Sequence, residues 1–437
     1  MEPRSTVRLS LKAYEALLPV ATAFVEKSAL AFGLGQQEAL ALTLATEEIF
    51  LYLCRISAPG TELDIQCRSA GYCVETGFHF EAAGFQMRAF NLTAVPSFED
   101  ETAVRETGLL IASRLVDRFK LEHVGARLNL TLIKDKVYPE PDSQDVPVCV
   151  PVSRFFIRRP DGEEVKASVR MIRHYCRDRF NPLSANFPGK VADIFAAGEL
   201  DAALAMDTAG HIGGVLFWTR NVPQVVDCFG PYVFHPESDP EMGVLLLDRC
   251  IEEIARSRAV GLINRYPGTG LPTRYFETLG SLALFREDGT CVDVEASYRQ
   301  LDEDKGIAVW AHPDLVPFLK AQYERLALPR EIRWVTAEGE ERSPISVLSA
   351  EMDRPRHWAT LRPLLYGEDA ATVLADHVRL LEREGFLALF FEMDLKNAWE
   401  AHFTPGLLKN GFEPRFVLPY GRRGDMVVFQ YRTHSKA

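Results

Sequence analysis

The sequence lacks the features that mark several large classes of protein. Its 49 lysines and arginines are outnumbered by 61 acidic residues, which gives a formal net charge of −12. A chain of this charge repels a phosphate backbone unless a local patch overrides the net field. No apolar run approaches the length of a membrane span, and the opening residues carry no apolar signal core. We therefore expect a cytoplasmic protein with no nucleic-acid partner and no membrane contact.

Motifs for metal binding and for disulfide frameworks are missing as well. The eight cysteines are scattered without a C-x-x-C pair, and the ten histidines form no H-E-x-x-H motif. No set of cysteines and histidines has the spacing of zinc ligands. The sequence therefore predicts reduced thiols and no metal site.

The chain does contain enough apolar residues for several cores. It has 437 residues, 47% of them hydrophobic, and one hydrophobic core rarely serves so long a chain. A stretch with prolines at positions 139, 141, 147 and 151 disfavours helix and marks a linker. We predict a multidomain protein of the α+β and α/β classes, divided into a domain at residues 1–137, a linker at 138–151, and domains at 152–300 and 301–437.

The region before the linker predicts helices and hairpins. Apolar residues recur at helical spacing in residues 14–32, 37–56 and 102–119. Alternating stretches on both sides of residues 69–71 are typical of a β-hairpin. A strand at 5–11 is expected before the helices, and a second hairpin is expected to end near residue 134.

This layout resembles the anti-sigma-factor branch of the GHKL ATPases over most of residues 5–135. In that family the second helix carries a glutamate and, four residues later, an asparagine that holds magnesium. Glu48 matches the glutamate, but Tyr52 stands in the second position and cannot supply the amide oxygen that magnesium would use. Starting from Glu47 instead places Leu51 there.

The other nucleotide-binding motifs of that family are also incomplete. Its adenine-binding Asp-x-Gly-x-Gly-Phe motif falls on residues 80–85, where the aspartate is absent and Gly84 is the glycine retained. A later glycine-rich turn survives at Gly108. The resemblance implies an α/β sandwich with a degenerate nucleotide pocket at Glu48, Gly84 and Gly108. The missing residues argue against binding of ATP with magnesium. The resemblance also allows a homodimer that forms through this domain. Glu48 also fits a simpler interpretation, an acid on the solvent face of a helix.

The stretch that organises the rest of the chain is residues 213–285. Strands that alternate with helices imply a sheet with at least one parallel pair and helices packed on its faces. The sequence predicts strands at 213–218 and 225–235, a helix at 243–258, a strand at 259–266, a short helix at 272–279 and a closing strand. Upstream it predicts a strand at 155–159, helices at 165–180 and 188–197, and a hairpin at 202–219.

This order resembles a GNAT-type acyltransferase domain over about residues 152–290. In that family the turn before the main helix holds the pyrophosphate of acetyl-CoA or another acyl-CoA through free amide groups and the helix dipole. The resemblance places this turn at Phe234, Ser238, Gly243 and Val244, although Gly243 is the one glycine of the motif that is kept. Three carboxylates also lie where phosphates would bind, and like charges at short range repel: Glu237, Asp239 and Glu241. Ordinary helix capping by Ser238 or Asp239 also explains these acids.

The catalytic residues implied by that family are also incomplete. The position of its proton-donating tyrosine holds Phe276, and the neighbouring Tyr275 would point about 100° away on the predicted helix. His235 and Glu237 are the remaining candidates for a general base, since His235 ends the strand that lies beside the acyl group in this fold. The pair of glycines at 268 and 270 is interpreted as an ordinary turn before a helix.

Residues 301–437 repeat the pattern of strands and helices more faintly. Leu407 occupies the acid position there, and no phosphate turn precedes the helix predicted at 370–384. A single helix is predicted at 397–409. We interpret this part as a divergent second GNAT-like domain.

Together these losses favour a cytoplasmic bacterial regulatory or scaffold protein that binds a protein partner or a small-molecule ligand between its modules. Two alternatives stay open. One is an acyl-CoA-dependent N-acyltransferase, in which His235 or Glu237 deprotonates an amine through water while strand residues 229–234 hold the acyl carbonyl. The other is an ATP-binding serine kinase of the anti-sigma type.

Overall fold

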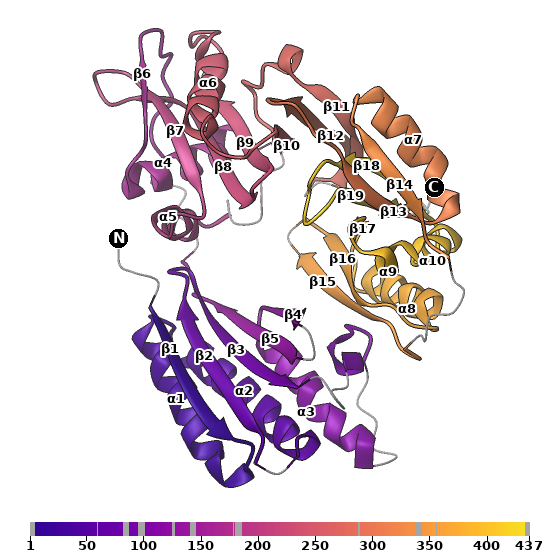
Figure 1. The fold of residues 1–437 in the computed structure, drawn as a ribbon. Helices are drawn as coiled ribbons and strands as arrows, with labels where there is room; N and C mark the ends of the chain where they lie inside the picture. Colours follow the sequence, from indigo (N-terminus) through magenta and orange to yellow (C-terminus); the bar gives the residue numbers. More distant parts are fainter. Residues whose placement is uncertain are drawn as a thin grey trace. The chain divides into compact units, whose positions relative to one another are not determined.

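The computed structural model describes residues 5–58, 60–81, 87–94, 101–124, 127–139, 146–177, 179, 186–286, 289–336, 343–354 and 356–432. The chain divides into two compact units, one of residues 1–139 with 347–349 and the other of residues 140–346 with 350–437. Each unit has its own sheets and helices (Figure 1).

The first unit is an antiparallel sheet with helices on one face (Figure 1). Along β2, every second residue is buried in the core, as the two-residue period of a strand requires. The strand order is β1-β2-β3-β5-β4, with β1 (Thr6–Lys12), β2 (Glu62–Ser69), β3 (Cys73–Glu81), β4 (Arg118–Val124) and β5 (Arg127–Asp135). The helices are η1 (Glu15–Leu17), α1 (Leu18–Ala31), α2 (Gln36–Ile56), η2 (Met87–Phe90) and α3 (Glu101–Leu115), of which η1 and η2 are short 3-10 helices.

The third helix of this unit is shorter than the sequence predicts. The prediction extended it to residue 119, whereas α3 ends at Leu115 and β4 begins at Arg118. The carboxylate of Asp117 accepts the N–H of Asp135 at 2.7 Å and a hydrogen bond from Lys134 Nζ at 3.1 Å. The chain is therefore already bound to β5 at this point, and helical spacing in the sequence does not reveal that pairing.

The second unit opens with a seven-stranded sheet. Its order is β11-β12-β10-β9-β8-β7-β6, in which β9 and β10 form the predicted parallel pair and the other neighbours are antiparallel. The strands are β6 (Phe156–Arg158), β7 (Asp201–Met206), β8 (Ile212–Val222), β9 (Val225–Val233), β10 (Gly261–Pro267), β11 (Glu277–Phe285) and β12 (Cys291–Gln300). The helices are α4 (Gly162–Tyr175), α5 (Pro188–Ala196) and α6 (Met242–Ile254).

Helices cover both faces of this sheet, as β7 shows. Leu204 packs in a core with α4 and α5, whereas Ala203 and Ala205 pack in a core with α6. Successive side chains of a strand point to opposite faces, so one short apolar strand serves both cores. This explains why β7 is apolar from Ala202 to Met206 instead of alternating.

Helix α4 begins three residues before the predicted start at 165. The side chain of Asp161 accepts the N–H of Glu164, and the side chain of Glu164 accepts the N–H of Asp161, both at 2.9 Å. This capping box satisfies two backbone donors at the helix start. The helix therefore begins with polar residues that the apolar spacing left out.

The short helix predicted at 272–279 is wrong. Thr273–Tyr275 form a 3-10 helix, η4, and the chain then enters β11, which pairs with β12. A short apolar run fits a helix or a strand, and the partner strand decides between them. Phe276 therefore lies between η4 and β11 instead of on a helix, and its comparison with the tyrosine of acyltransferases loses its basis.

The outer edge of β11 is bound by side chains from the C-terminal part of the unit. β11 is the last strand of its sheet, so the backbone groups on its outer side have no further strand to pair with. Gln430 accepts the N–H of Ala283 at 3.0 Å and donates to its C=O at 2.6 Å. Arg415 donates to the C=O of Ser281 at 3.1 Å. These bonds protect the edge from pairing with other chains. They also join β11 to the C-terminal part of the unit, and we call this junction the seam.

The C-terminal part contains a two-stranded parallel sheet and a five-stranded mixed sheet. The first pairs β13 (Ile307–Ala311) with β14 (Arg330–Trp334), and the second has the order β15-β16-β17-β19-β18. The latter strands are β15 (Val347–Asp353), β16 (Trp358–Leu365), β17 (Ala388–Asp394), β18 (Phe412–Leu418) and β19 (Met426–Tyr431). The helices are η5 (Pro313–Leu315), α7 (Val316–Arg325), α8 (Ala370–Arg383), α9 (Ala398–Ala401) and α10 (Thr404–Lys409). The single helix predicted at 397–409 is thus divided, and Pro405 stands in the first turn of α10.

A buried ion network fastens β14 to the rest of this part. Arg330 contacts Asp304 at 2.8 Å and Asp425 at 2.7 Å, and all three side chains are at most 1% exposed. The hydroxyl of Tyr420 donates a hydrogen bond to Asp304 at 2.6 Å. The guanidinium carbon of Arg330 lies over the ring of Tyr420, 4.9 Å from the ring centre. Burial opposes ionisation of Asp304, but hydrogen bonds from Arg330 and Tyr420 outweigh it and hold its pKa below the usual range.

We expect Arg330→Met to destabilise the protein by about 3–5 kcal/mol, because it leaves two buried carboxylates without their cation. Chemical denaturation measures this change in the free energy of unfolding. Arg333→Met is the matched control, since Arg333 lies on the same strand with its partner Glu331 in solvent, and it should leave the midpoint nearly unchanged. Equal effects of the two variants would contradict a stabilising role for the network.

Candidate functional site

The turn between β9 and α6, residues 234–241, contains two of the four predicted acyl-CoA residues and both candidates for a general base, and we call it the α6 turn. Ser238 is 7% exposed, and its Oγ accepts the N–H of Val152 at 3.2 Å. The N–H of Asp239 donates to the C=O of Val152 at 3.1 Å. Asp239 also accepts the N–H of Glu241 at 2.9 Å. Ser238 thus holds the turn to the start of the unit, and Asp239 stabilises it locally.

The other predicted residues of this turn divide between the core and the surface. Phe234 is buried in the core with α4 and α5, Glu237 is exposed, and Val244 is half-buried in the first turn of α6. The Nδ1 atom of His235 accepts the N–H of Glu237 at 3.1 Å. In the neutral imidazole the proton then lies on Nε2, so neither ring nitrogen of His235 is free to act as a general base while this bond is made.

A loop of the same unit closes the end of β9, and we call residues 268–270 the closing loop. Thr269 Oγ1 donates to the C=O of Val233 at 2.8 Å and accepts its N–H at 3.1 Å. The N–H of Gly270 donates to the C=O of Pro231 at 3.0 Å. The backbone groups that could hold an acyl carbonyl at residues 229–234 are thus bonded within the chain.

The glycines of the closing loop are required by its close approach to the strand and helix. A Cβ on Gly268 would collide with the C=O of Pro231, and a Cβ on Gly243 would collide with the C=O of Gly270. Gly243 therefore admits the protein's own loop at the start of α6. The pair of glycines was visible in the sequence, but its contact with residues far along the chain was not.

The first unit brings two of the predicted nucleotide-pocket residues together. A Cβ on Gly108 of α3 would collide with the carboxylate of Glu48 on α2. Burial, reinforced by Glu47 and opposed by Arg55, raises the pKa of Glu48. A carboxylate that already loses solvation here would also repel a phosphate. Gly84, the third predicted residue, lies outside the described residues.

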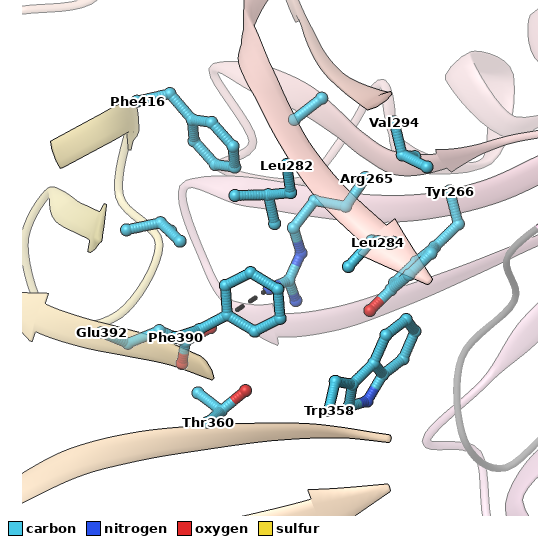
Figure 2. Close-up of a pocket in the computed structure, with 12 residues that line it drawn as sticks. Arg265, Tyr266, Leu282, Leu284, Val294, Trp358, Thr360, Phe390, Glu392 and Phe416 are labelled. Carbon is cyan, nitrogen blue, oxygen red and sulfur yellow. Dashed lines mark hydrogen bonds and ion pairs between the residues drawn. The ribbon is translucent and has the colours of Figure 1, made fainter. Parts of the chain in front are cut away.

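A pocket that the sequence did not predict lies in the second unit, and we call it the seam pocket (Figure 2). It opens between β10, β11 and β12 on one side and β16, β17, β18 and β19 on the other. It encloses a cavity of about 70 Å³; because one buried water needs roughly 10–15 Å³ on this measure, roughly five to seven waters would fit. Its lining is mainly apolar and aromatic: Tyr266, Leu282, Leu284, Val294, Ala296, Trp358, Phe390, Phe416 and Val428, together with Arg265, Thr360 and Glu392.

The charged end of the seam pocket is built from both sides of the seam. Arg265 extends from β10 towards Glu392 on β17, and their Nη1 and Oε1 atoms are 3.4 Å apart (Figure 2). Arg362 binds Glu392 more closely, at 2.6 Å, and also binds Glu351 at 2.6 Å. Burial opposes ionisation of Glu392, but Arg362 and Arg265 outweigh it and lower its pKa to about 2.

Arg265 has a hydrogen-bonding group that its surroundings leave unused. Its Nε is shielded from solvent and has no hydrogen-bond partner among the described residues. On the side of β9, burial raises the pKa of Asp227, with Arg265 opposing and Glu392 adding to the shift. An arginine within the apolar strand Gly261–Pro267 was the one sequence signal for this site, but its partner lies more than a hundred residues away.

Glu400, on α9, is a further buried acid. It is 5% exposed; its Oε2 accepts the N–H of Asp394 at 2.7 Å, and its Oε1 accepts a hydrogen bond from Asn397 at 2.8 Å. Burial raises the pKa of Glu400 to about 7, although the bonds from Asn397 and Asp394 favour its charged form. This carboxyl group therefore titrates near neutral pH in the folded protein.

Within the described ranges, no helix is long and apolar enough to cross a bilayer. The same residues contain no group of three or more histidine, cysteine, aspartate or glutamate side chains placed to hold a metal ion.

No family model matches the chain, and no curated protein matches it. Solved structures of acetyltransferases are similar over about a third of it. An aminoglycoside 6'-N-acetyltransferase complexed with coenzyme A is 10% identical over 34% of this chain and 99% of its own, with a TM-score of 0.27. A GNAT superfamily phosphinothricin acetyltransferase from Sinorhizobium meliloti, in complex with acetyl-CoA, is 18% identical over 35% and 90%, with a TM-score of 0.25.

A GNAT-family protein from Desulfovibrio desulfuricans, proposed to be an acetyltransferase, is 17% identical over 34% of this chain and 99% of its own, with a TM-score of 0.26. At these scores the similarity concerns part of the chain and leaves its activity open. The comparisons give no support to the resemblance of the first unit to anti-sigma factors. The protein is a mixed α/β multidomain protein.

We expect Gly243→Ala to displace the closing loop and destabilise the protein by about 1–3 kcal/mol, the usual cost of overpacking. Gly162→Ala is the matched control: Gly162 also lies in the first turn of a helix, and a Cβ there meets nothing within 4 Å. The control should be neutral or slightly stabilising because alanine favours helix. Urea denaturation of both variants measures the difference, and equal stabilities would contradict close packing at Gly243.

Glu400→Gln should reduce the dependence of stability on pH. The folded-state pKa of Glu400, about 7, exceeds that of an unfolded glutamate. The contribution of this carboxyl group to the free energy of unfolding is therefore complete below about pH 4.5 and is lost as pH rises through about 7. A neutral glutamine avoids this loss, which amounts to about 3 kcal/mol. Denaturation midpoints at pH 5, 6, 7 and 8 should show a gap between variant and wild type that widens with pH. Glu303→Gln, on the surface, should show a constant gap, and a constant gap for both would refute the assignment.

Proposed function

We propose that this chain is a regulatory binding protein whose ligand site is the seam pocket, and that its acyl-CoA turn is not a working catalytic site. The observation that carries this proposal is the closing loop. Its bonds to Pro231 and Val233 occupy the end of β9, where the acyl carbonyl would otherwise bind, and the start of α6 is packed against Gly270. A ligand at this place would first have to break those contacts.

The seam pocket supports the second half of the proposal. It is concave and mainly apolar, and its lining includes a few polar groups, which is the usual composition of a small-molecule site. Arg265 within it is a charged donor whose Nε is unused among the described residues. A small ligand that binds both sides of the seam would change how β10–β12 lie relative to β16–β19.

The remaining predictions about partners belong to the same proposal. They are a protein partner that responds to ligand, a homodimer through the first unit, and the absence of nucleic-acid and membrane partners. The net charge of −12 supports the absence of a nucleic-acid partner. All eight cysteines are free thiols, which suits a reducing cytoplasm.

The second candidate function is acyl-CoA-dependent N-acylation of an amine. The arrangement of β9, the α6 turn and α6 favours it, because opening of the closing loop would expose the N–H of Val233 beside His235 and Glu237. Acetyl-CoA and coenzyme A are therefore the ligands to test against the first proposal.

We expect a thermal-shift titration with acetyl-CoA, free coenzyme A and magnesium ATP to leave the unfolding midpoint of the protein unchanged. A ligand at a hundred times its Kd adds about 2.7 kcal/mol to the folded state, which moves a midpoint by several degrees. A saturable shift with acetyl-CoA would overturn the proposal in favour of the acyltransferase, and Glu237→Gln and His235→Gln would then be the first variants to assay for acyl transfer. A shift with magnesium ATP would instead assign a working nucleotide pocket to the first unit.

A further inference from the structure

The seam pocket combines an unused buried donor with aromatic walls. An arginine has five N–H groups and no acceptor, and a buried donor without a partner destabilises the folded protein. In Arg265 the Nε has no partner among the described residues, and the contact of Nη1 with Glu392 is long, at 3.4 Å. An acceptor atom supplied by a ligand would remove this cost.

Arg265 can turn to a ligand without leaving Glu392 alone. Arg362 holds the other oxygen of Glu392 at 2.6 Å and lies on the neighbouring strand β16. The carboxylate would therefore keep a close cationic partner while the guanidinium of Arg265 moves. This arrangement differs from the network at Arg330, where one cation serves two carboxylates.

The charges around the pocket argue against a charged ligand. Arg265 and Arg362 face Glu392 and Glu351 in equal number. The charges of Arg422 and Arg356 also act on Glu392 and Tyr266, and that of Asp227 acts on Arg265 from β9. An added anion would meet the carboxylate of Glu392, and an added cation would meet the two guanidinium groups. A neutral acceptor such as a carbonyl oxygen satisfies Arg265 without either repulsion.

The walls and the size of the pocket indicate the body of the ligand. Leu284, Trp358 and Phe390 form a buried apolar cluster at the seam, with Tyr266 and Leu282 packed against it. Figure 2 shows Arg265 and Phe390 together at the middle of the pocket, with Trp358 and Tyr266 at one end. Space for roughly five to seven waters suits one ring with a small polar head, and aromatic walls favour an aromatic ring.

We infer that the seam pocket binds a small uncharged aromatic carbonyl compound, with its carbonyl oxygen on Arg265 and its ring between Leu282 and Phe390. The inference rests on the proposed function, because it assigns a ligand class to the same site. Burial keeps the pKa of Tyr266 above its usual value, so its neutral hydroxyl is available as a second donor at the other end.

The test compares four single-ring compounds on the full-length protein by isothermal titration: benzamide, benzoate, benzylamine and toluene. Benzamide should bind wild-type protein at least tenfold more tightly than benzoate or benzylamine. Arg265→Met should weaken benzamide by roughly tenfold to a hundredfold, the value of a hydrogen bond to a charged group. It should leave toluene unchanged, because the apolar walls remain.

Leu282→Trp keeps Arg265 and fills the pocket, so it should abolish binding of every compound. If toluene binds as tightly as benzamide, or benzoate binds best, the ligand class is wrong while the seam pocket remains a binding site. If none of the four binds wild-type protein and acetyl-CoA does, both the ligand class and the proposed function are wrong. The comparison of compounds on wild-type protein decides the ligand class even where Arg265→Met fails to fold.

Discussion

The backbone of β11 has to be satisfied on its outer edge, and the second unit is arranged around this requirement. Unpaired N–H and C=O groups at the edge of a sheet are costly when buried and invite pairing with other chains when exposed. Here Arg325 donates to the C=O of Leu279 at 2.8 Å, and Arg415 and Gln430 bind the backbone further along the strand. These three side chains come from α7, β18 and β19, so the edge is closed by a second sheet that need not continue the first.

The seam pocket is a consequence of that closure. Two sheets joined through side chains, instead of through a continuous ladder of backbone hydrogen bonds, leave space where their faces diverge. Arg265 and Glu392 enter this space from opposite sides, and the second arginine, Arg362, stabilises the glutamate. The pocket therefore owes its apolar walls to the two sheets and its charged end to the pairing across them.

The same need for backbone partners has a different outcome at the end of β9. There the chain satisfies the backbone groups of Val233 and the C=O of Pro231 by itself through Thr269 and Gly270, so a ligand would have to displace these bonds. At Arg265 the chain leaves a donor without a partner among the described residues. The contrast explains why the proposed ligand site lies at the seam and not at the turn that the sequence singled out.

Sequence periodicity was sufficient for elements whose structure depends on their own residues. The spacing of apolar residues predicted α2 and α6, because a helix stripe is formed by residues close together in the sequence. The alternation of strands with helices predicted at least one parallel pair, which the structure shows to be β9 and β10. Periodicity failed at residues 277–285 and at residue 117, where a partner far along the chain decides the structure. It also failed to show why Gly243 and Gly268 are glycines, since the carbonyl groups that a Cβ would meet come from other elements.

The sequence by itself thus determined the acidic character of the protein, the order of most helices and strands, and the loss of several residues that the resembled families use. These properties depend on composition and on near neighbours. Only the tertiary structure decided that a loop closes β9, that side chains from the C-terminal part close β11, and that Arg265 meets Glu392, 127 positions further along the chain. The physical reason is that the energies of burial, hydrogen bonding and charge pairing depend on distance in space, and separation along the chain does not reveal that distance.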